Sequence, residues 1–171
     1  MSFFNLPASL ERAQERLKGA AKAGGRRPRS DRGTPRVDAR TLAILVEACG
    51  GYDRPAMAEL LARVGKACRA KRLAPPSRAS VYKWLATLPT PSYEVAGLPP
   101  SVRHALYNLT YDSKVPAHQL AFYCFNYGDL AATSFAAGLP WLALYQAARM
   151  PGYRSKSRGL VEAVTRARGI A

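Results

Sequence analysis

Acidic residues are scarce in this chain. Its 171 residues include 11 Asp or Glu against 26 Lys or Arg, which gives a formal net charge of +15 and a pI near 10.3. The excess is +6 over residues 1–40, +5 over residues 41–90 and +4 over residues 91–171, so it is not confined to one tail. A basic excess of this size indicates a polyanionic partner, and nucleic acid is the commonest one.

Cysteine and histidine are also few. The three cysteines, Cys49, Cys68 and Cys124, are widely spaced, and the sequence contains neither a CxxC pair nor a Cys/His cluster at metal-ligand spacing. This spacing argues against a zinc finger. We expect reduced, buried thiols in a cytoplasmic protein that holds no metal and no cofactor.

Catalytic motifs are missing from the sequence. His104 and His118 fall in different predicted helices, and neither has a carboxylate at helical spacing to orient it. No GxSxG, HExxH or P-loop spacing occurs. The acidic metal ligands of a transposase core and the Arg-His-Arg cluster of a tyrosine recombinase are not found either. We therefore predict that the protein is not an enzyme.

An uninterrupted apolar run long enough for a membrane is lacking as well. Residues 130–148 carry no formal charge, but Thr133, Ser134, Gln146 and the break at residues 138–140 make this run too polar to span a bilayer. The N-terminus has no basic region ahead of an apolar core, so it does not read as a secretory signal. The sequence predicts no membrane association.

What the chain does contain is helical periodicity, which predicts an all-α fold. Residues 1–37 read as an amphipathic helix over residues 9–23 followed by a basic, flexible arm, and residues 38–89 read as three short helices. A Pro-rich connector follows over residues 90–100, with a short extended piece around residues 93–95. Residues 101–171 form a second helical lobe, with helices expected over residues 101–110, 116–127, 129–137, 140–149 and 157–168, and with Ser101 and Asp129 as helix caps.

The third helix of the 38–89 segment has two different faces. It follows Pro75 and Pro76, with Ser77 as N-cap, and places Val81, Trp84, Leu85 and Leu88 on one side. The other side is small near its start and then polar and basic. Such a face suits entry into a major groove, because small residues allow close approach and longer ones reach base edges and phosphates.

Three short helices that end in "PSRASVYKWL" resemble the helix-turn-helix superfamily, in particular its transposase, recombinase and regulator modules. The resemblance covers residues 38–89 and implies duplex DNA as partner, although the break over residues 71–77 is longer than a three- or four-residue turn. It implies that Arg78, Ala79, Ser80 and Lys83 face the DNA. The full set of candidate DNA-binding residues adds Tyr82, Thr87 and Arg72 in this module, Arg26, Arg27 and Arg29 in the arm, and Arg154, Lys156 and Arg158 near the C-terminus.

The second lobe is rich in aromatic and small residues. A weak second helix-turn-helix pattern surrounds Gly138, but the helix after it carries Trp141, Leu142, Leu144 and Tyr145 and is too apolar to read bases. We expect this lobe to form a core, a dimer interface or a contact with a protein partner. Its aromatic side chains follow helical stripes and are expected in the core rather than on a stacking surface: Tyr107, Tyr111, Phe122, Tyr123, Phe125 and Tyr127.

The sequence therefore predicts a homodimeric transcriptional regulator that binds DNA specifically, including the autoregulating antitoxin type. Two alternatives stay open. One is an accessory DNA-binding protein of a mobile element or recombination complex. The other is a basic adaptor that binds an acidic protein or RNA.

Overall fold

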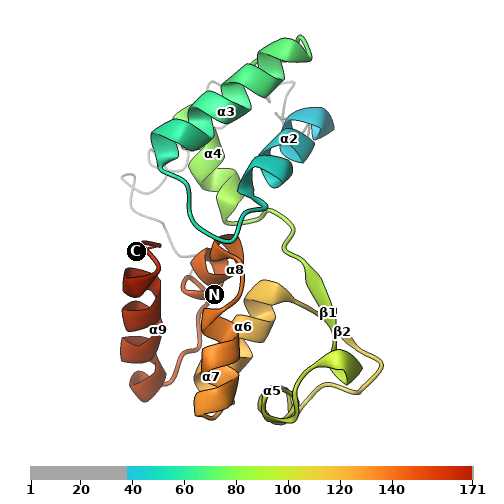
Figure 1. The fold of residues 1–171 in the computed structure, drawn as a ribbon, viewed down its shortest axis with the longest axis vertical. Helices are drawn as coiled ribbons and strands as arrows, with labels where there is room; N and C mark the ends of the chain where they lie inside the picture. The colour runs from blue at the N-terminus through green and yellow to red at the C-terminus, as the bar shows by residue number, and fades with distance from the viewer. Residues whose placement is uncertain (1–37, 171) are drawn as a thin grey trace, which may run out of the picture. The chain divides into compact units, whose positions relative to one another are not determined.

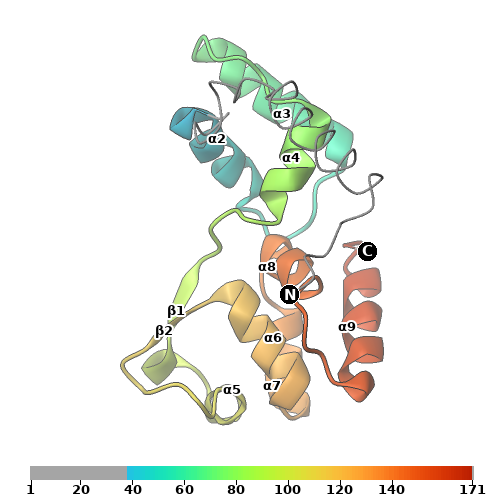
Figure 2. The same cartoon turned by 180° about the vertical axis from the view of Figure 1, so that it is seen from behind.

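Helices make up most of the chain from Asp38 onward (Figure 1, and from behind in Figure 2). The computed structural model describes residues 38–170, and 61% of these residues are helical. The prediction of a mainly helical fold is confirmed. The predicted helix over residues 9–23 and the basic arm that follows it lie outside the described residues.

Three helices occupy the segment from residue 38 to residue 89. They are α2 (Ala39–Cys49), α3 (Met57–Ala70) and α4 (Arg78–Leu85). The carboxylate of Asp38 accepts the backbone N–H of Arg40 at 2.9 Å and so caps α2, and Gly50 follows the last helical residue. α2 packs against α3. The residues that these helices bury recur at helical spacing, as predicted: Leu45, Leu60, Val64, Cys68, Val81 and Leu85.

A small antiparallel sheet departs from the all-α prediction. Strand β1 (Ser92–Glu94) pairs with strand β2 (Lys114–Pro116), and Tyr93 lies opposite Val115. The extended piece around residues 93–95 was predicted, but its partner strand was not. A three-residue strand is too short for apolar alternation to show in the sequence.

The segment between the two strands contains a 3-10 turn, η1 (Val95–Gly97), and the short helix α5 (Pro100–Ala105). The predicted helix over residues 101–110 is therefore too long. The prediction of Ser101 as a cap is wrong, because Pro100 already occupies the first helical turn, where its fixed φ angle and missing N–H are tolerated.

Four further helices follow in the predicted order: α6 (Ala117–Tyr127), α7 (Leu130–Ala137), α8 (Trp141–Ala147) and α9 (Ser155–Ala167). The predicted cap at Asp129 is confirmed, since its carboxylate accepts the N–H of Ala132 at 2.7 Å. α6 and α7 approach closely at Gly128. A Cβ atom there would overlap the Cys124 carbonyl oxygen and the Ala132 methyl group, so no other residue fits without a shift.

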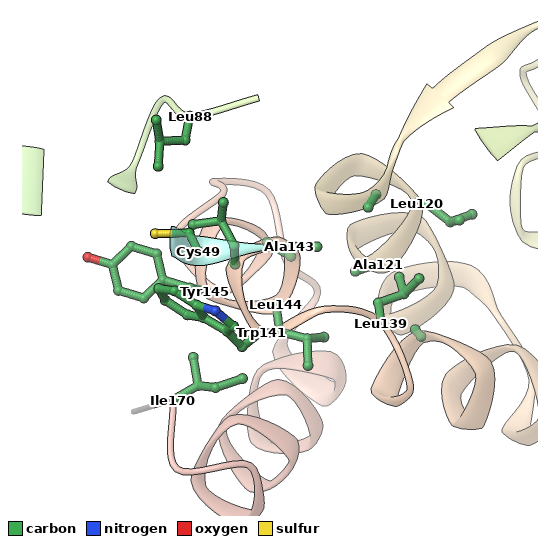
Figure 3. Close-up of a cluster of buried hydrophobic side chains, with 14 of the residues drawn as sticks. Cys49, Leu88, Leu120, Ala121, Leu139, Trp141, Ala143, Leu144, Tyr145 and Ile170 are labelled. Atoms are coloured by element: carbon green, nitrogen blue, oxygen red, sulfur yellow. The ribbon is translucent and has the colours of Figure 1, made fainter. Parts of the chain in front are cut away.

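α8 is the most deeply buried of the described helices, with every residue from Trp141 to Ala147 inside the core. Figure 3 shows Trp141 and Tyr145 of α8 among side chains from distant segments, including Cys49 at the end of α2, Leu88 after α4, and Ile170. The prediction that this helix packs in a core is confirmed. One hydrophobic core therefore joins residues from α2 to the C-terminal segment.

A buried amide ties α8 to the end of α4. The Nε2 group of Gln146, whose side chain belongs to a residue only 6% exposed, donates to the carbonyl oxygens of Leu85 at 2.9 Å and Leu88 at 2.8 Å. Helix ends leave carbonyl groups without helical partners. Gln146 supplies donors for two carbonyl groups at this end of α4.

Two arginines tie the α2–α3 loop to the C-terminal part of the chain. Arg168 donates to the carbonyl oxygens of Ala137 at 2.6 Å and Tyr52 at 2.8 Å, and its guanidinium lies 4.1 Å from the centre of the Tyr52 ring. Arg54 donates to the Ile170 carbonyl at 2.8 Å. These two cations are used for internal contacts, so their charge does not count toward a free basic surface.

None of the described helices is long and apolar enough to cross a membrane. All three cysteines are buried, free thiols, as predicted. Burial raises the pKa of Cys49 to about 11 and that of Cys124 to about 12.

Candidate nucleic-acid interface

α4 is held by its two ends in different ways. At its start, the hydroxyl of Ser77 accepts the N–H of Ser80 at 3.2 Å, which confirms Ser77 as the N-cap. At its end, Gln146 binds the carbonyl groups of Leu85 and Leu88. Val81 and Leu85 are fully buried between these ends. The opposite side of α4 is therefore fixed as its outer face.

The structure exposes most of the side chains that the sequence assigns to this outer face. Arg78, Ala79, Lys83 and Thr87 are exposed. Thr87 uses its hydroxyl to bind the carbonyl oxygen of Trp84 at 3.2 Å. The arrangement leaves Ala79 as the small residue between two cations.

Two of the assigned side chains are less accessible. The hydroxyl of Ser80 lies 3.0 Å from that of Ser77, and Ser80 is half-buried. Tyr82 is also half-buried and packs against the core, while the Arg78 guanidinium lies 5.7 Å from the centre of its ring. Tyr82 therefore positions Arg78 as well as lining the face.

Arg72 occupies a backbone position that normally favours glycine. Its φ angle is +55°, in the left-handed region. α3 ends here in a Schellman motif: the N–H of Leu73 binds the Cys68 carbonyl at 2.8 Å, and the N–H of Arg72 binds the Arg69 carbonyl at 3.0 Å. An exposed arginine is thus kept where its Cβ costs about 1–2 kcal/mol.

Carboxylates are absent from this part of the chain. No Asp or Glu occurs in the sequence between Glu59 and Glu94, a stretch that includes α4 and most of α3. Within residues 38–170, the ion pairs are Lys114 with Glu94 at 3.1 Å and Arg168 with Asp53 at 3.8 Å. Six exposed cations lie on α3, on α4 or in the connection between these two helices, and none has a carboxylate partner within that range: Lys66, Arg69, Lys71, Arg72, Arg78 and Lys83.

Three of these six, Lys66, Arg69 and Lys71, were not among the candidate residues. They lie on the exposed side of α3 or at its end, away from the buried stripe of Leu60, Val64 and Cys68. The sequence does contain a signal for these three cations, because the absence of Asp and Glu between Glu59 and Glu94 can be read from it directly. Their neighbour Arg63 has another role, because it donates to the Ala48 carbonyl at 2.7 Å and so caps α2.

The predicted cations near the C-terminus belong to another element. Arg154 precedes α9, and Lys156 and Arg158 lie in its first turn, all exposed. The Arg154 guanidinium lies 4.4 Å from the centre of the Tyr127 ring, and its backbone N–H binds the Asn126 side-chain oxygen at 2.9 Å. The arm residues Arg26, Arg27 and Arg29 lie outside the described residues.

The aromatic prediction holds only in part. Phe125 is in the core at 4% exposure, as expected. Tyr107 and Tyr111 are exposed, so their assignment to the core is wrong. The reason is that α5 ends at Ala105, which places both tyrosines in the turns after it rather than on a helical stripe.

A groove of about 410 Å³ lies beside the end of α4, lined by Thr87, Leu88, His118, Gln146 and Arg149, among others. The Nδ1 atom of His118 lies 2.8 Å from the Thr90 hydroxyl oxygen, and burial lowers the pKa of this histidine. Among the described residues, no three His, Cys, Asp or Glu side chains gather as a metal site would require. Comparison with family models, with curated proteins and with solved structures finds no match.

Proposed function

We propose that this protein binds duplex DNA in a sequence-specific manner and acts as a transcriptional regulator. In this proposal α4 enters the major groove. Arg78 and Lys83 reach base edges or phosphates, and Ala79 allows the helix to approach closely. The cations at the end of α3 and in the connection bind the phosphate backbone.

The observation that carries the proposal is the set of six exposed cations without a carboxylate partner among residues 38–170. A solvated helix face in an ordinary domain mixes both signs of charge, because opposite charges at helical spacing stabilise it. Here one sign is absent from α4 and from α3 beyond Glu59. The strained backbone at Arg72 points in the same direction, since an arginine is retained at a stability cost.

The length of α4 makes a homodimer part of the proposal. Eight residues span about 12 Å, which places only a few side chains against base edges. Two copies on a two-fold site double the contacts and supply the specificity that one short helix lacks. The oligomeric state is measured by light scattering of the full chain.

The test is fluorescence anisotropy with a labelled duplex from the upstream region of the protein's own gene, against a scrambled duplex. We expect tighter binding to the upstream duplex and a loss of about 5- to 150-fold in Lys83→Gln, the range for a side chain that contacts a base. Each phosphate contact contributes about −0.9 to the slope of log affinity against log salt.

Lys114→Gln is the matched control, because it removes the same charge from a lysine that is paired with Glu94. It should bind the upstream duplex as the unmodified protein does. Equal binding to both duplexes that Lys83→Gln does not change would contradict the proposal. Preference for the ends of a mobile element over the upstream region would favour the accessory role instead.

A further inference from the structure

A second surface, on α5, α6 and the turns that follow α5, exposes aromatic rings. Tyr107 is 69% exposed and Tyr111 is 64% exposed. Single exposed apolar residues are common, whereas a contiguous exposed patch often marks an interaction site. Both tyrosines are outside the α2–α4 group, so the proposed DNA contact does not use them.

The rings form a connected series. The Tyr107 and Tyr127 rings are 5.3 Å apart at an angle of 75°, and the Tyr127 and Tyr123 rings are 6.0 Å apart at 34°. The Tyr123 hydroxyl accepts a hydrogen bond from Asn108 at 3.0 Å, which fixes its orientation. The Tyr127 phenol also raises the pKa of the Tyr107 hydroxyl, as expected for two adjacent phenols.

A pocket of about 280 Å³ adjoins Tyr107. Tyr107 and Tyr111 both line it, together with Arg103, His104, Leu106 and Leu109. The Arg103 guanidinium lies 5.5 Å from the centre of the Tyr111 ring. No carboxylate lines this pocket within the described part of the chain.

Two cations lie against aromatic rings of this surface, one at Tyr111 and one at Tyr127. The Arg103 guanidinium lies beside the Tyr111 ring, and the Arg154 guanidinium lies over the Tyr127 ring. A ligand that suits this surface has flat faces that stack on phenol rings and negative charges that pair with guanidinium groups. Single-stranded nucleic acid has both, because every base has a stacking face and every linkage carries a phosphate. An acidic peptide supplies the charge without the stacking faces.

We propose that the surface formed by Arg103, Tyr107, Tyr111, Tyr127 and Arg154 binds single-stranded nucleic acid, with a base stacked in the pocket between Tyr107 and Tyr111. The neighbouring base stacks on the side of Tyr127 and Arg154. The strand crosses the surface with its phosphates against the two arginines. This site is separate from α4 and does not depend on the proposed duplex binding.

The test compares two labelled oligonucleotides on the full chain, both about 15 nucleotides long, within the range that one stacking module covers. One is oligo-dT, and the other is an abasic strand with the same number of phosphates. We expect the unmodified protein to bind oligo-dT about 10-fold or more tightly than the abasic strand, since stacking contributes and charge is equal. Tyr107→Leu/Tyr111→Leu should bind both strands equally.

Tyr52→Leu is the matched control, since Tyr52 is another exposed tyrosine, in the α2–α3 loop. It should keep the preference for oligo-dT. Lys83→Gln should keep it too while losing affinity for duplex DNA, so the failure of one proposal is distinguishable from the failure of the other. Equal binding of oligo-dT and the abasic strand by the unmodified protein would overturn the proposal. Tighter binding to polyglutamate than to oligo-dT would overturn it in favour of an acidic protein partner.

Discussion

Replacing Gln146 by Leu should destabilise the protein and release the end of α4. The side chain lies in the core on α8, and its amide donates to the carbonyl oxygens of Leu85 and Leu88 at 2.9 and 2.8 Å. Leu has nearly the same volume, so the substitution removes the two hydrogen bonds with little change in packing.

The magnitude follows from the fate of the two carbonyl groups. A typical hydrogen bond contributes about 1 kcal/mol to stability, and a buried group left without a partner costs about 1–3 kcal/mol. Leu88 and Gln146 both line the groove beside α4, which gives water a route to the freed Leu88 carbonyl oxygen. We therefore expect the free energy of unfolding to fall by about 2–4 kcal/mol, with the lower end applying if water replaces the amide.

The assay is urea unfolding followed by far-UV circular dichroism, with Gln119→Leu as the matched control. Gln119 is exposed on α6, so its replacement should change the free energy of unfolding by less than about 0.5 kcal/mol. Gln146→Glu should be worse than Gln146→Leu at neutral pH, because it places a carboxylate against two carbonyl oxygens. A loss in Gln146→Leu that matches the Gln119→Leu control would refute this account of how α4 is anchored.

Two further predictions concern the turn after α3 and the buried thiols. Arg72→Gly should have a free energy of unfolding about 1 kcal/mol higher than that of Arg72→Ala in a urea titration, because only Gly adopts the left-handed backbone without strain. Both variants should reduce the magnitude of the salt slope of duplex binding by about 0.9, since each loses one cation. Equal stability of the two variants would contradict the proposed backbone strain. Burial raises the pKa of Cys49 to about 11 and that of Cys124 to about 12 from the ordinary value of 9.0, so the folded protein keeps protons that the unfolded chain loses above pH 9. These two thiols should therefore leave the free energy of unfolding unchanged below pH 9 and lower it as the pH rises toward 12. In the folded protein they should react slowly with a disulfide reagent at pH 8. Rapid labelling of both cysteines in the folded protein would contradict this prediction.

The helices could be predicted from the sequence because their local signals agree with their packing. Ser77 and Asp129 are caps in both, and Gly128 and Gly138 separate α6, α7 and α8 where breaks were expected. The buried stripe of α3 also matches its periodicity. These features depend on neighbours within one or two helical turns, which a sequence pattern records.

The features that could not be predicted depend on residues far apart in the chain. The strand β2 exists because β1 pairs with it, and its three residues have no pattern of their own. The amide of Gln146 donates to carbonyl groups some sixty positions earlier in the chain. A polar residue within an apolar run does not show in the sequence which group it will bind. The exposure of Tyr107 and Tyr111 follows from the early end of α5, which is a matter of a few residues in a helix boundary.

The way in which α4 is held bears on the proposed function. Its C-terminal end is fixed to α8 by Gln146, and Leu85 and Leu88 are buried beside it. Its N-terminal end is capped only by Ser77, and Arg78 and Ala79 are exposed there. Recognition helices contact bases mainly through their N-terminal residues. A helix anchored at its C-terminal end and open at its N-terminal end presents those residues at a fixed angle. Gln146→Leu in the buried α8 should therefore lower duplex affinity, although it replaces no residue of the exposed face of α4.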